Sequence, residues 1–413
     1  MDSQLHSRPR RSHGASPLPK FAVNQKRVET RVLVTSALAV FAVLMLAVAP
    51  VLASSESVIY SFANPPDAFR PQCNLVADAA GNMYGTTFSG GTNGLGAIFK
   101  VTPTGTESVV YSFAGGADGR HPVAGLVIDK KTGNLYGTTV YGGTANNGTV
   151  FMFNPATGVE TVLYSFLGGV NDGANPYSSV VRAGTTIFGT TMSGGAFDYG
   201  TVFKLTSKGK VTILHSFNSA YPTLDGSYPY AGLTLYKGIL YGTTTLGGAH
   251  NLGTVFSITK TGGYALLYSF EGGTTDGQSP YAGVVFDPAG NMYGATYGGG
   301  SDNAGTVFLL AAGGGESILH HFRRNNGDGI NPYGTLVRFK NNFYGTATGG
   351  NADGGKVYKI TPTGTETIVH SFTGGADGFN PFGALLVGAD KALYGTTYAG
   401  GTSDLGTVFK VIP

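Results

Sequence analysis

The chain has 413 residues, among them 67 glycines, 25 phenylalanines and 23 tyrosines, no tryptophan and one cysteine, and its formal net charge is +3. Residues 1–53 contain seven Lys or Arg and two Asp or Glu, so residues 54–413 contain 19 basic and 21 acidic residues. A nearly neutral body lacks the basic surface of nucleic-acid-binding proteins, so we expect no nucleic-acid partner. The single Cys73 excludes an internal disulfide, and we expect it to be a buried thiol.

The N-terminal segment has the pattern of an export signal. Residues 1–31 are polar and basic, and residues 32–53 are apolar except for Thr35 and Ser36. Small residues around Ala53 predict signal-peptidase cleavage after that residue. The apolar run also has the length of a membrane-spanning helix, so an uncleaved anchor is the alternative. Both interpretations predict a secreted or cell-envelope protein whose residues 54–413 lie outside the cytoplasm, with membrane contact only through this segment if it stays uncleaved.

Residues 54–413 are built from seven repeats. A Leu-Tyr-Gly-Thr-Thr run or a variant recurs every 50 to 53 residues, followed by a glycine-rich loop, a Gly-Thr-Val-Phe-Lys-like run and a Tyr-Ser-Phe-like run. Self-similarity at this period indicates stacked supersecondary units. The aromatic residues of the first run are Tyr84, Tyr136, Phe188, Tyr241, Tyr293, Tyr344 and Tyr394.

The second repeat shows the expected unit most clearly. It predicts strands over residues 124–129, 135–140, 149–153 and 160–166, joined by Gly, Asn and Pro turns and by a loop over residues 142–148. Four short antiparallel strands of this kind are typical of a β-propeller blade. We interpret the glycine inside each Tyr-Gly-Thr-Thr run as room for the close approach of a neighbouring sheet.

The two ends of the repeat region complement each other. Residues 56–62 match the fourth strand of a repeat, and residues 406–413 match the third. The N-terminal outer strand can therefore complete the C-terminal blade and remove an exposed sheet edge. The sequence thus predicts an all-β fold, a seven-bladed β-propeller of four-stranded antiparallel blades over residues 54–413.

The connection from each fourth strand to the next first strand contains Asp-Gly-x-x-Pro, degenerate in the first repeat. We expect it on the same face as the second-to-third loops, and loops on a rigid scaffold often carry function. A ring of aspartates could bind Ca²⁺ or another cation. Turn formation explains the same pattern, because Asp bonds its own backbone and Gly takes positive φ, and we favour it. The candidate cation ligands are Asp118, Asp172, Asp225, Asp276, Asp328 and Asp377.

An aromatic residue follows the proline of this connection in five repeats, whereas Gln72 and Val123 stand there in the first two. At the mouth of the central channel such rings could stack on sugars or hold a peptide. They could equally pack between blades. The interruption makes one arc of the rim different, as a directional site requires. The candidate ligand-binding residues are Tyr177, Tyr230, Tyr281, Tyr333 and Phe382.

No catalytic constellation is visible in the sequence. His215, His320 and His370 occupy an outer-strand column that tyrosines fill in the other repeats, so we expect them to be packing or edge residues. No histidine cluster has metal-ligand spacing, and the glycine-rich loops lack the Lys-Ser/Thr ending of a phosphate-binding loop. No cofactor is therefore predicted apart from the Ca²⁺ considered above.

The linked motifs resemble a known repeat. Residues 135–139, 148–151 and 164–169 are similar to the GloVer tandem repeat of secreted bacterial proteins with choice-of-anchor architecture, and the resemblance covers residues 56–413. The strand order also resembles NHL-type propeller blades. Members of the GloVer family often carry a C-terminal anchoring module. Here residues 406–413 match a strand of the last repeat, so we expect any anchor to be the N-terminal segment. The family supplies no catalytic residues.

We therefore expect a monomeric, extracytoplasmic recognition or scaffold protein that binds a glycan or an extracellular protein through its loop-bearing face and channel mouth. A cation-dependent enzyme, similar to lyases or lactonases, is the alternative, because one fold hosts many functions. A purely structural envelope component is the third possibility. The sequence does not decide whether the protein is an enzyme, and the lack of a recognisable catalytic motif favours a protein without enzymatic activity.

Overall fold

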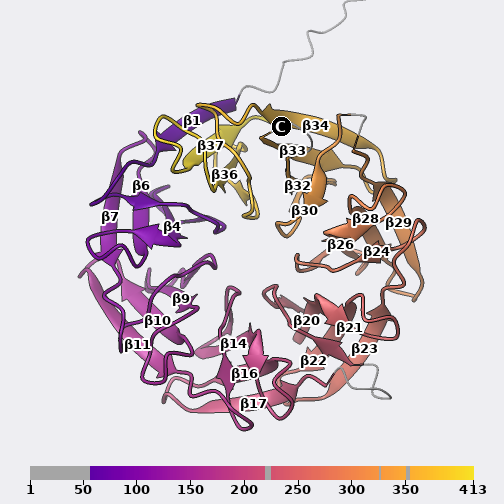
Figure 1. The fold of residues 1–413 in the computed structure, drawn as a ribbon, viewed down its shortest axis with the longest axis horizontal. Coiled ribbons are helices and arrows are strands. Elements are labelled where there is room, and N and C mark those ends of the chain that lie inside the picture. The colour runs from indigo at the N-terminus through magenta and orange to yellow at the C-terminus, as the bar shows by residue number, and fades with distance from the viewer. Residues whose placement is uncertain (1–55, 219–224, 325–326, 350–353) are drawn as a thin grey trace, which may run out of the picture. The chain divides into compact units, whose positions relative to one another are not determined.

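The computed structural model describes residues 56–218, 225–324, 327–349 and 354–413. The predicted signal peptide or anchor over residues 1–53 lies outside these residues. Within them every regular element is a β-strand, and no helix is present that could cross a membrane. Over the same residues, seven four-stranded antiparallel blades surround a central axis (Figure 1). The predicted seven-bladed propeller is confirmed.

The first four blades follow one another along the chain. Blade 1 contains β3 (Val76–Ala77), β4 (Met83–Thr87), β6 (Ala97–Val101) and β7 (Glu107–Ser112). Blade 2 contains β8 (Val127–Ile128), β9 (Leu135–Thr139), β10 (Thr149–Asn154) and β11 (Val159–Ser165). Blade 3 contains β13 (Val181–Ala183), β14 (Thr186–Thr191), β16 (Thr201–Leu205) and β17 (Val211–Ser216). Blade 4 contains β19 (Thr234–Tyr236), β20 (Ile239–Thr244), β22 (Thr254–Thr259) and β23 (Tyr264–Ser269).

The remaining blades complete the ring. Blade 5 contains β25 (Val285–Phe286), β26 (Met292–Thr296), β28 (Thr306–Leu310) and β29 (Glu316–His321). Blade 6 contains β31 (Val337–Phe339), β32 (Asn342–Thr348), β33 (Gly355–Ile360) and β34 (Glu366–Phe372). Blade 7 contains β35 (Leu386–Val387), β36 (Leu393–Thr397), β37 (Thr407–Val411) and, as its outer strand, β1 (Glu56–Ser61).

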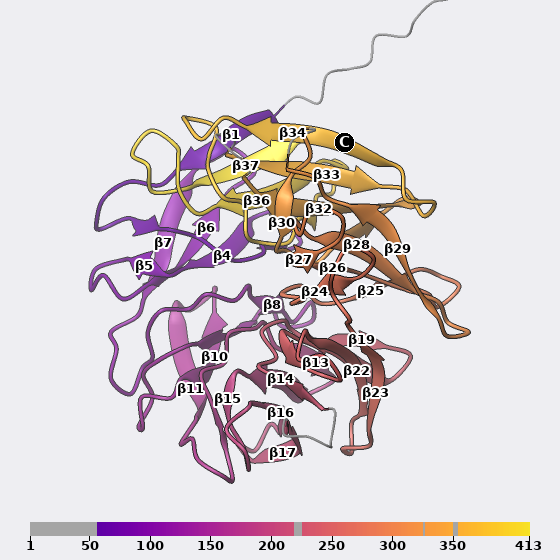
Figure 2. The same cartoon turned by 45° about the vertical axis from the view of Figure 1, so that its right-hand side comes forward.

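The ring closes between the two ends of the repeat region, as predicted. β1 pairs antiparallel with β37, from Glu56 opposite Val411 to Ser61 opposite Thr407, and the two strands lie side by side in both views (Figures 1 and 2). The Phe62 amide then donates to the Gly406 carbonyl at 3.0 Å. This pairing covers the edge of β37, which would otherwise present unpaired backbone groups.

Short ladders in blades 1, 3, 4 and 5 and single bridges in blades 2 and 7 join the connection to the second-to-third loop of the blade it enters, so both long segments lie on one face. The four ladders pair β2 (Ala68–Phe69) with β5 (Ser89–Gly90), β12 (Gly173–Ala174) with β15 (Ser193–Gly194), β18 (Gly226–Ser227) with β21 (Leu246–Gly247), and β24 (Gly277–Gln278) with β27 (Gly298–Gly299). In blade 6, β30 (Ile330–Pro332) pairs directly with β32. The expected loop-bearing face is therefore present.

Large aromatic rings form the contact between neighbouring blades. The phenylalanine that ends each outer strand packs edge-on against the aromatic residue of the third strand in the next blade, as Phe113 does with Phe151 at a centroid separation of 5.2 Å. Both rings are fully buried. Edge-to-face geometry places the positive edge of one ring against the negative face of the other. The same contact joins Phe62 to Phe99, so the N-terminal segment also contributes to the core between blades 7 and 1.

The Tyr-Gly-Thr-Thr run requires a glycine for a different reason from the one expected. Gly137 lies opposite Phe151 in the same blade, and a Cβ on Gly137 would lie 2.5 Å from the Phe151 ring and 2.9 Å from Leu126. The glycine therefore makes room for a ring of its own blade, and the prediction that it accommodates a neighbouring sheet is wrong. Equivalent contacts recur at Gly85, Gly189, Gly242, Gly294, Gly345 and Gly395.

The two threonines of the run have separate partners. Thr138 donates from Oγ1 to the Ser178 carbonyl of the next blade at 3.0 Å, while Thr139 bonds Thr149 on the neighbouring strand at 2.8 Å. Such inter-blade bonds also explain why the innermost strands are shorter than predicted. Ala124 and Gly125 stay outside the two-residue β8 because their carbonyls bond to other blades: Ala124 accepts from Thr86, and Gly125 accepts from Ser179.

Candidate functional site

The connection into each blade places one residue at the mouth of the channel. Two positions earlier stands a residue with left-handed backbone geometry, such as Asn175 with φ of 55°. Its amide donates to the Asn147 carbonyl of blade 2, and its carbonyl accepts from the Met192 amide of blade 3. The backbone is therefore held from both sides. The equivalent left-handed residues are Arg70, His121, Asn175, Tyr228, Ser279, Asn331 and Asn380.

A cavity of about 230 Å³ opens where the inner ends of the blades meet. All seven blades contribute to its wall, and the five aromatic residues predicted from the sequence are all part of it: Tyr177, Tyr230, Tyr281, Tyr333 and Phe382. The structure thus brings these residues, far apart in the chain, into one wall around the channel mouth.

The five rings form a continuous wall. Centroids of consecutive rings are 5.0 to 5.2 Å apart, from Tyr177 through Tyr230, Tyr281 and Tyr333 to Phe382. The Tyr281 and Tyr333 rings are stacked with an interplanar angle of 17°. Each ring is half-buried. The residues therefore pack on one another and also face the cavity, and their role in ligand binding stays a prediction.

The tyrosine hydroxyls of this wall are uncharged at neutral pH. Burial raises the pKa of Tyr230 and of Tyr281, and a neighbouring phenol adds to the effect in each case. Tyr333 and Tyr230 share a side-chain hydrogen bond, and burial raises the pKa of Tyr333 as well. The wall thus combines apolar ring faces with neutral hydroxyls that donate and accept hydrogen bonds.

The opposite arc of the cavity has no large ring at the equivalent positions. Gln72 and Val123 stand there, and Asn74, Ser178 and Ser179 add polar groups to the lining. The cavity is therefore asymmetric, with aromatic faces on the arc of blades 3 to 7 and the amides of Gln72 and Asn74 on the remaining arc. The two arcs differ because the first two repeats have Gln72 and Val123 where the other five repeats have an aromatic residue.

The connection aspartates lie at the outer strands and not in this cavity. Asp172 accepts hydrogen bonds from the Tyr164 hydroxyl, the Leu167 amide and the Gly173 amide, each at 2.8 Å. Four other connection aspartates accept from the outer-strand tyrosine or histidine at 2.8 to 3.0 Å, namely Asp67, Asp118, Asp225 and Asp276. These are the contacts of a turn-forming residue. The proposed cation role of Asp118, Asp172, Asp225, Asp276 and Asp377 stays a prediction.

A column of half-buried glutamates beside these aspartates was not singled out from the sequence. Glu107 is the first residue of the outer strand β7 and Glu160 the second residue of β11, and each lies near the aspartate of the preceding connection, Asp67 and Asp118 respectively. Each has a buried Oε1 without a hydrogen-bond partner. The recurrence of Glu at the start of the Tyr-Ser-Phe run was the available signal. The full column is Glu56, Glu107, Glu160, Glu316 and Glu366.

Burial raises the pKa of Glu107 and of Glu160 to about 8, and the adjacent aspartate is the second cause. A raised pKa in the folded state means that folding is favoured while the group is protonated. That contribution is fully present below the unfolded value of 4.5, and it is lost as the pH rises through about 8. The ring is therefore stabilised at mildly acidic pH.

We expect the double variant Glu107→Gln/Glu160→Gln to flatten this pH dependence, because an amide does not ionise. At pH 8.5 the variant should be roughly 1–2 kcal/mol more stable than the wild type, after allowance for solvent screening. Urea denaturation at pH 5 and pH 8.5 measures the difference. Glu271→Gln, at an exposed side chain, is the control and should change neither value. Equal pH slopes for wild type and double variant would refute the expectation.

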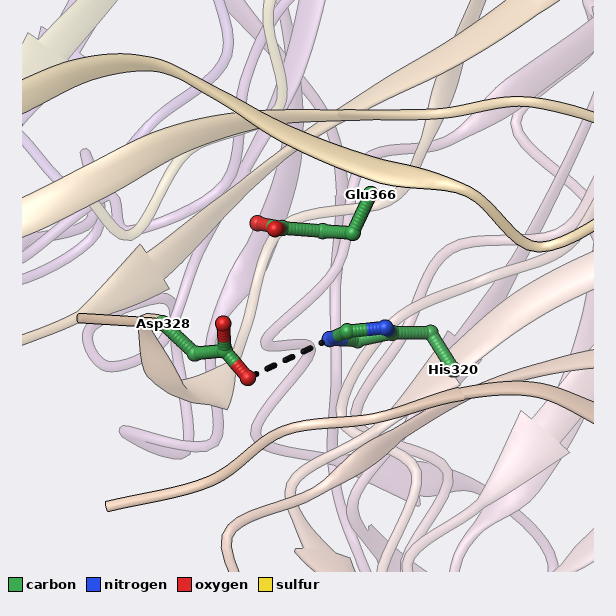
Figure 3. Close-up of side chains that lie close together, drawn as sticks. All are labelled: His320, Asp328 and Glu366. Atoms are coloured by element: carbon green, nitrogen blue, oxygen red, sulfur yellow. Dashed lines mark ion pairs between the residues drawn. The ribbon is translucent and has the colours of Figure 1, made fainter. Parts of the chain in front are cut away.

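One blade interface groups three residue types that bind metals. His320 of β29, Asp328 of the following connection and Glu366 of β34 have ligand atoms within 4.8 Å of one another, and among the described residues they form the single group of this kind (Figure 3). The predicted cation candidate Asp328 is thus the one that lies in a group suited to a metal. His320 was expected to be a packing residue, and its ring does pack edge-on against Phe322 at 4.9 Å.

Solved structures confirm the architecture. An oligogalacturonate lyase from Vibrio parahaemolyticus has 10% identity to this chain and a TM-score of 0.55, with 86% of this chain and 93% of that chain covered. An oligogalacturonate lyase in complex with manganese has 12% identity and a TM-score of 0.54, covering 87% and 93%. At such identities the likeness concerns the fold alone. No curated protein matches the chain significantly.

The repeat motifs give a more specific relationship. The model of the Gloeobacter/Verrucomicrobia repeat matches residues 50–256 and again residues 187–409, so the two matches together span the propeller. The same residues supply the paired glycine and aromatic ring, the inter-blade threonine bonds and the closing strand described above. The chain belongs to the Gloeobacter/Verrucomicrobia repeat family.

Proposed function

We propose that the propeller is an extracytoplasmic recognition module that binds the end of a glycan chain at the channel mouth. The observation that carries the proposal is the wall of five aromatic rings around the cavity. The apolar faces of sugar rings stack on such side chains, and sugar hydroxyls exchange hydrogen bonds with phenols and amides. Tyrosine hydroxyls on one arc and Gln72 and Asn74 on the other offer both kinds of group.

Size and charge support a neutral sugar terminus. The cavity of about 230 Å³ is smaller than the ~300–1,000 Å³ of most drug-sized ligand sites. One or two sugar residues at a chain end therefore suit it better than an internal segment of a polymer. The described residues that line the cavity include no Asp, Glu, Lys or Arg, so recognition would depend on shape and hydrogen bonds and not on ion pairs.

We expect Tyr230→Ala/Tyr281→Ala to abolish binding in a glycan array. In a titration the double variant should weaken the affinity for the glycan by about 2–3 kcal/mol, or roughly 30- to 150-fold, because two stacking faces are lost. Tyr230→Phe/Tyr281→Phe keeps both rings and removes the hydroxyls, so it should retain most of the affinity. Unfolding temperatures of both variants control for folding. Unchanged binding by the alanine variant would exclude this site.

A cation-dependent enzyme is the second candidate, and the group of His320, Asp328 and Glu366 is the observation that favours it. Two propellers of similar fold are named as oligogalacturonate lyases, one of them in complex with manganese. The three residues lie at outer strands and the cavity at inner ones, so the candidate ligands are not part of the cavity wall. Incubation of the purified protein with oligogalacturonate and Mn²⁺, followed by detection of unsaturated products, tests this candidate.

A further inference from the structure

We propose that Arg70 forms an anion subsite at the channel mouth, which binds a carboxylate or sulfate group of the glycan just outside the cavity. The inference rests on the proposed function, because it assumes that the end of a sugar chain occupies the cavity. It narrows the ligand class to chains with a neutral terminal sugar and an acidic substituent on the following residue. Arg70 lies in the connection into blade 1 and has left-handed backbone geometry, with φ of 59°.

Arg70 stands above the arc of the cavity that has no large ring. Gln72, two residues further along the chain, lines the cavity directly. The Arg70 guanidinium carbon is 5.5 Å from the centroid of the Tyr398 ring, and that centroid is 5.7 Å from the Phe382 centroid. The guanidinium is therefore about 11 Å or less from the last ring of the aromatic wall. A short sugar chain can contact both groups at once.

The Arg70 guanidinium has free hydrogen-bond donors. Its side chain is exposed, and among the described residues it forms no hydrogen bond and no ion pair. Other arginines of this protein are engaged: Arg182 pairs with Asp129 at 2.9 Å, and Arg324 donates to two loop carbonyls. A guanidinium that lies over an aromatic ring keeps its in-plane N–H groups available, and their fork matches two oxygens of a carboxylate or sulfate.

Acidic side chains near Arg70 in the fold bond to other groups. Asp67, three residues earlier, accepts hydrogen bonds from one tyrosine hydroxyl and two backbone amides. Asp404 precedes Leu405, whose carbonyl accepts from the Arg70 amide, and the Asp404 carboxylate accepts from the Gly400 amide. Neither aspartate forms an ion pair with Arg70 in the part of the chain that the structure describes. The guanidinium is therefore free to contact an anionic ligand.

The basic residues at the left-handed positions gather on this one arc. Among these seven positions Arg70 in blade 1 and His121 in blade 2 are basic, and the same two blades have Gln72 and Val123 in place of a ring. The arc is continuous, since Phe88 donates its amide to the Arg70 carbonyl and accepts from His121 Nδ1 at 2.8 Å. The Phe88 and His121 rings stack at 4.5 Å. One arc thus offers positive charge where the other offers ring faces.

The test uses the full-length protein on an array of matched glycan pairs that end in galactose, glucose, mannose or rhamnose. The members of a pair differ by one carboxylate or one sulfate on the residue next to the terminal sugar. We expect the acidic member to bind the wild type about 10-fold more tightly, as a charge-assisted hydrogen bond at an exposed site allows. Carboxylate pairs and sulfate pairs show which anion the subsite prefers. Added salt should reduce this gain and leave the neutral member unaffected.

Arg70→Asn removes the charge and should abolish the gain while the affinity for the neutral member stays the same. Asparagine is compatible with the left-handed backbone, because it stands at the equivalent positions 175, 331 and 380. Lys208→Gln is the matched control. It removes one exposed charge from the turn between β16 and β17, on the opposite face, and should keep the full gain.

The two members of each pair separate the subsite from the glycan site itself. If the neutral members bind and the acidic members gain nothing, the subsite is overturned and the glycan site stands. The same holds if Arg70→Asn keeps the gain. If neither member of any pair binds, both the subsite and the proposed function are overturned.

Discussion

Deletion of residues 54–62 should prevent the propeller from folding to its native state at ordinary temperatures. The deletion removes β1 and leaves the whole edge of β37 unpaired. It also removes Phe62, a fully buried ring that packs on Phe99 at 5.0 Å. Loss of one buried phenylalanine side chain costs ~3–5 kcal/mol, which is already a large part of the ~5–15 kcal/mol total stability of most domains.

Circular dichroism, size-exclusion chromatography and thermal unfolding of the deleted protein measure this effect. A chain that lacks only residues 1–53 is the matched control and should keep the unfolding temperature of the wild type. A synthetic peptide of residues 54–62, added to the deleted chain, should restore part of the stability, because the edge of β37 is its template. A deleted chain that melts at the wild-type temperature would show that the ring does not depend on this strand.

Gly137→Ala should destabilise the protein by about 3 kcal/mol or more, which is at the upper end for overpacking a core. The added methyl group would lie 2.5 Å from the Phe151 ring. That ring cannot move away, because it is fully buried and its other side packs on Phe113 of the preceding blade. Urea denaturation gives the free energy directly.

Two comparisons separate this clash from a general effect of alanine. Gly313→Ala places the same methyl group where no atom lies within 4 Å, at a glycine without positive φ, and should be nearly neutral. The double variant Gly137→Ala/Phe151→Leu shortens the ring side chain and should recover part of the loss, giving a favourable coupling energy between the two positions. A Gly137→Ala protein as stable as the wild type would contradict the described contact.

The sequence predicts the ring well because each blade repeats one local pattern. Strand boundaries in blade 2 differ from the prediction by at most one residue at β9, β10 and β11, since Gly and Pro turns mark them. The predicted first strand is too long because the carbonyls of Ala124 and Gly125 bond to other blades, and a local pattern contains no information on such partners. The aromatic wall was visible because one position in the repeat is aromatic five times.

The pairing of connection aspartates with glutamates could not be predicted in the same way. Asp328 and Glu366 belong to adjacent blades, and their proximity depends on how one blade is turned against the next. A single glutamate at the start of an outer strand looks like a solvent-exposed residue in sequence. Only the packed ring shows that its Oε1 is buried beside a second carboxylate. The histidine column has the same difficulty, because His320 and His215 look alike until their neighbours are known.

The seven left-handed residues before the connection prolines have an evolutionary consequence. Their main-chain bonds fix the backbone, as they do at Asn175, while their side chains comprise three asparagines and one each of arginine, histidine, tyrosine and serine. An exchange at one of these positions keeps the main-chain bonds and alters the chemistry of the face, provided that the new residue tolerates positive φ. At His121, Asn175 and Asn331 it would also remove a side-chain bond to a backbone carbonyl. Asparagine meets that condition most readily, and a β-branched residue does not. A circle of exchangeable side chains on one main-chain frame would let this face change its ligand without a change of fold.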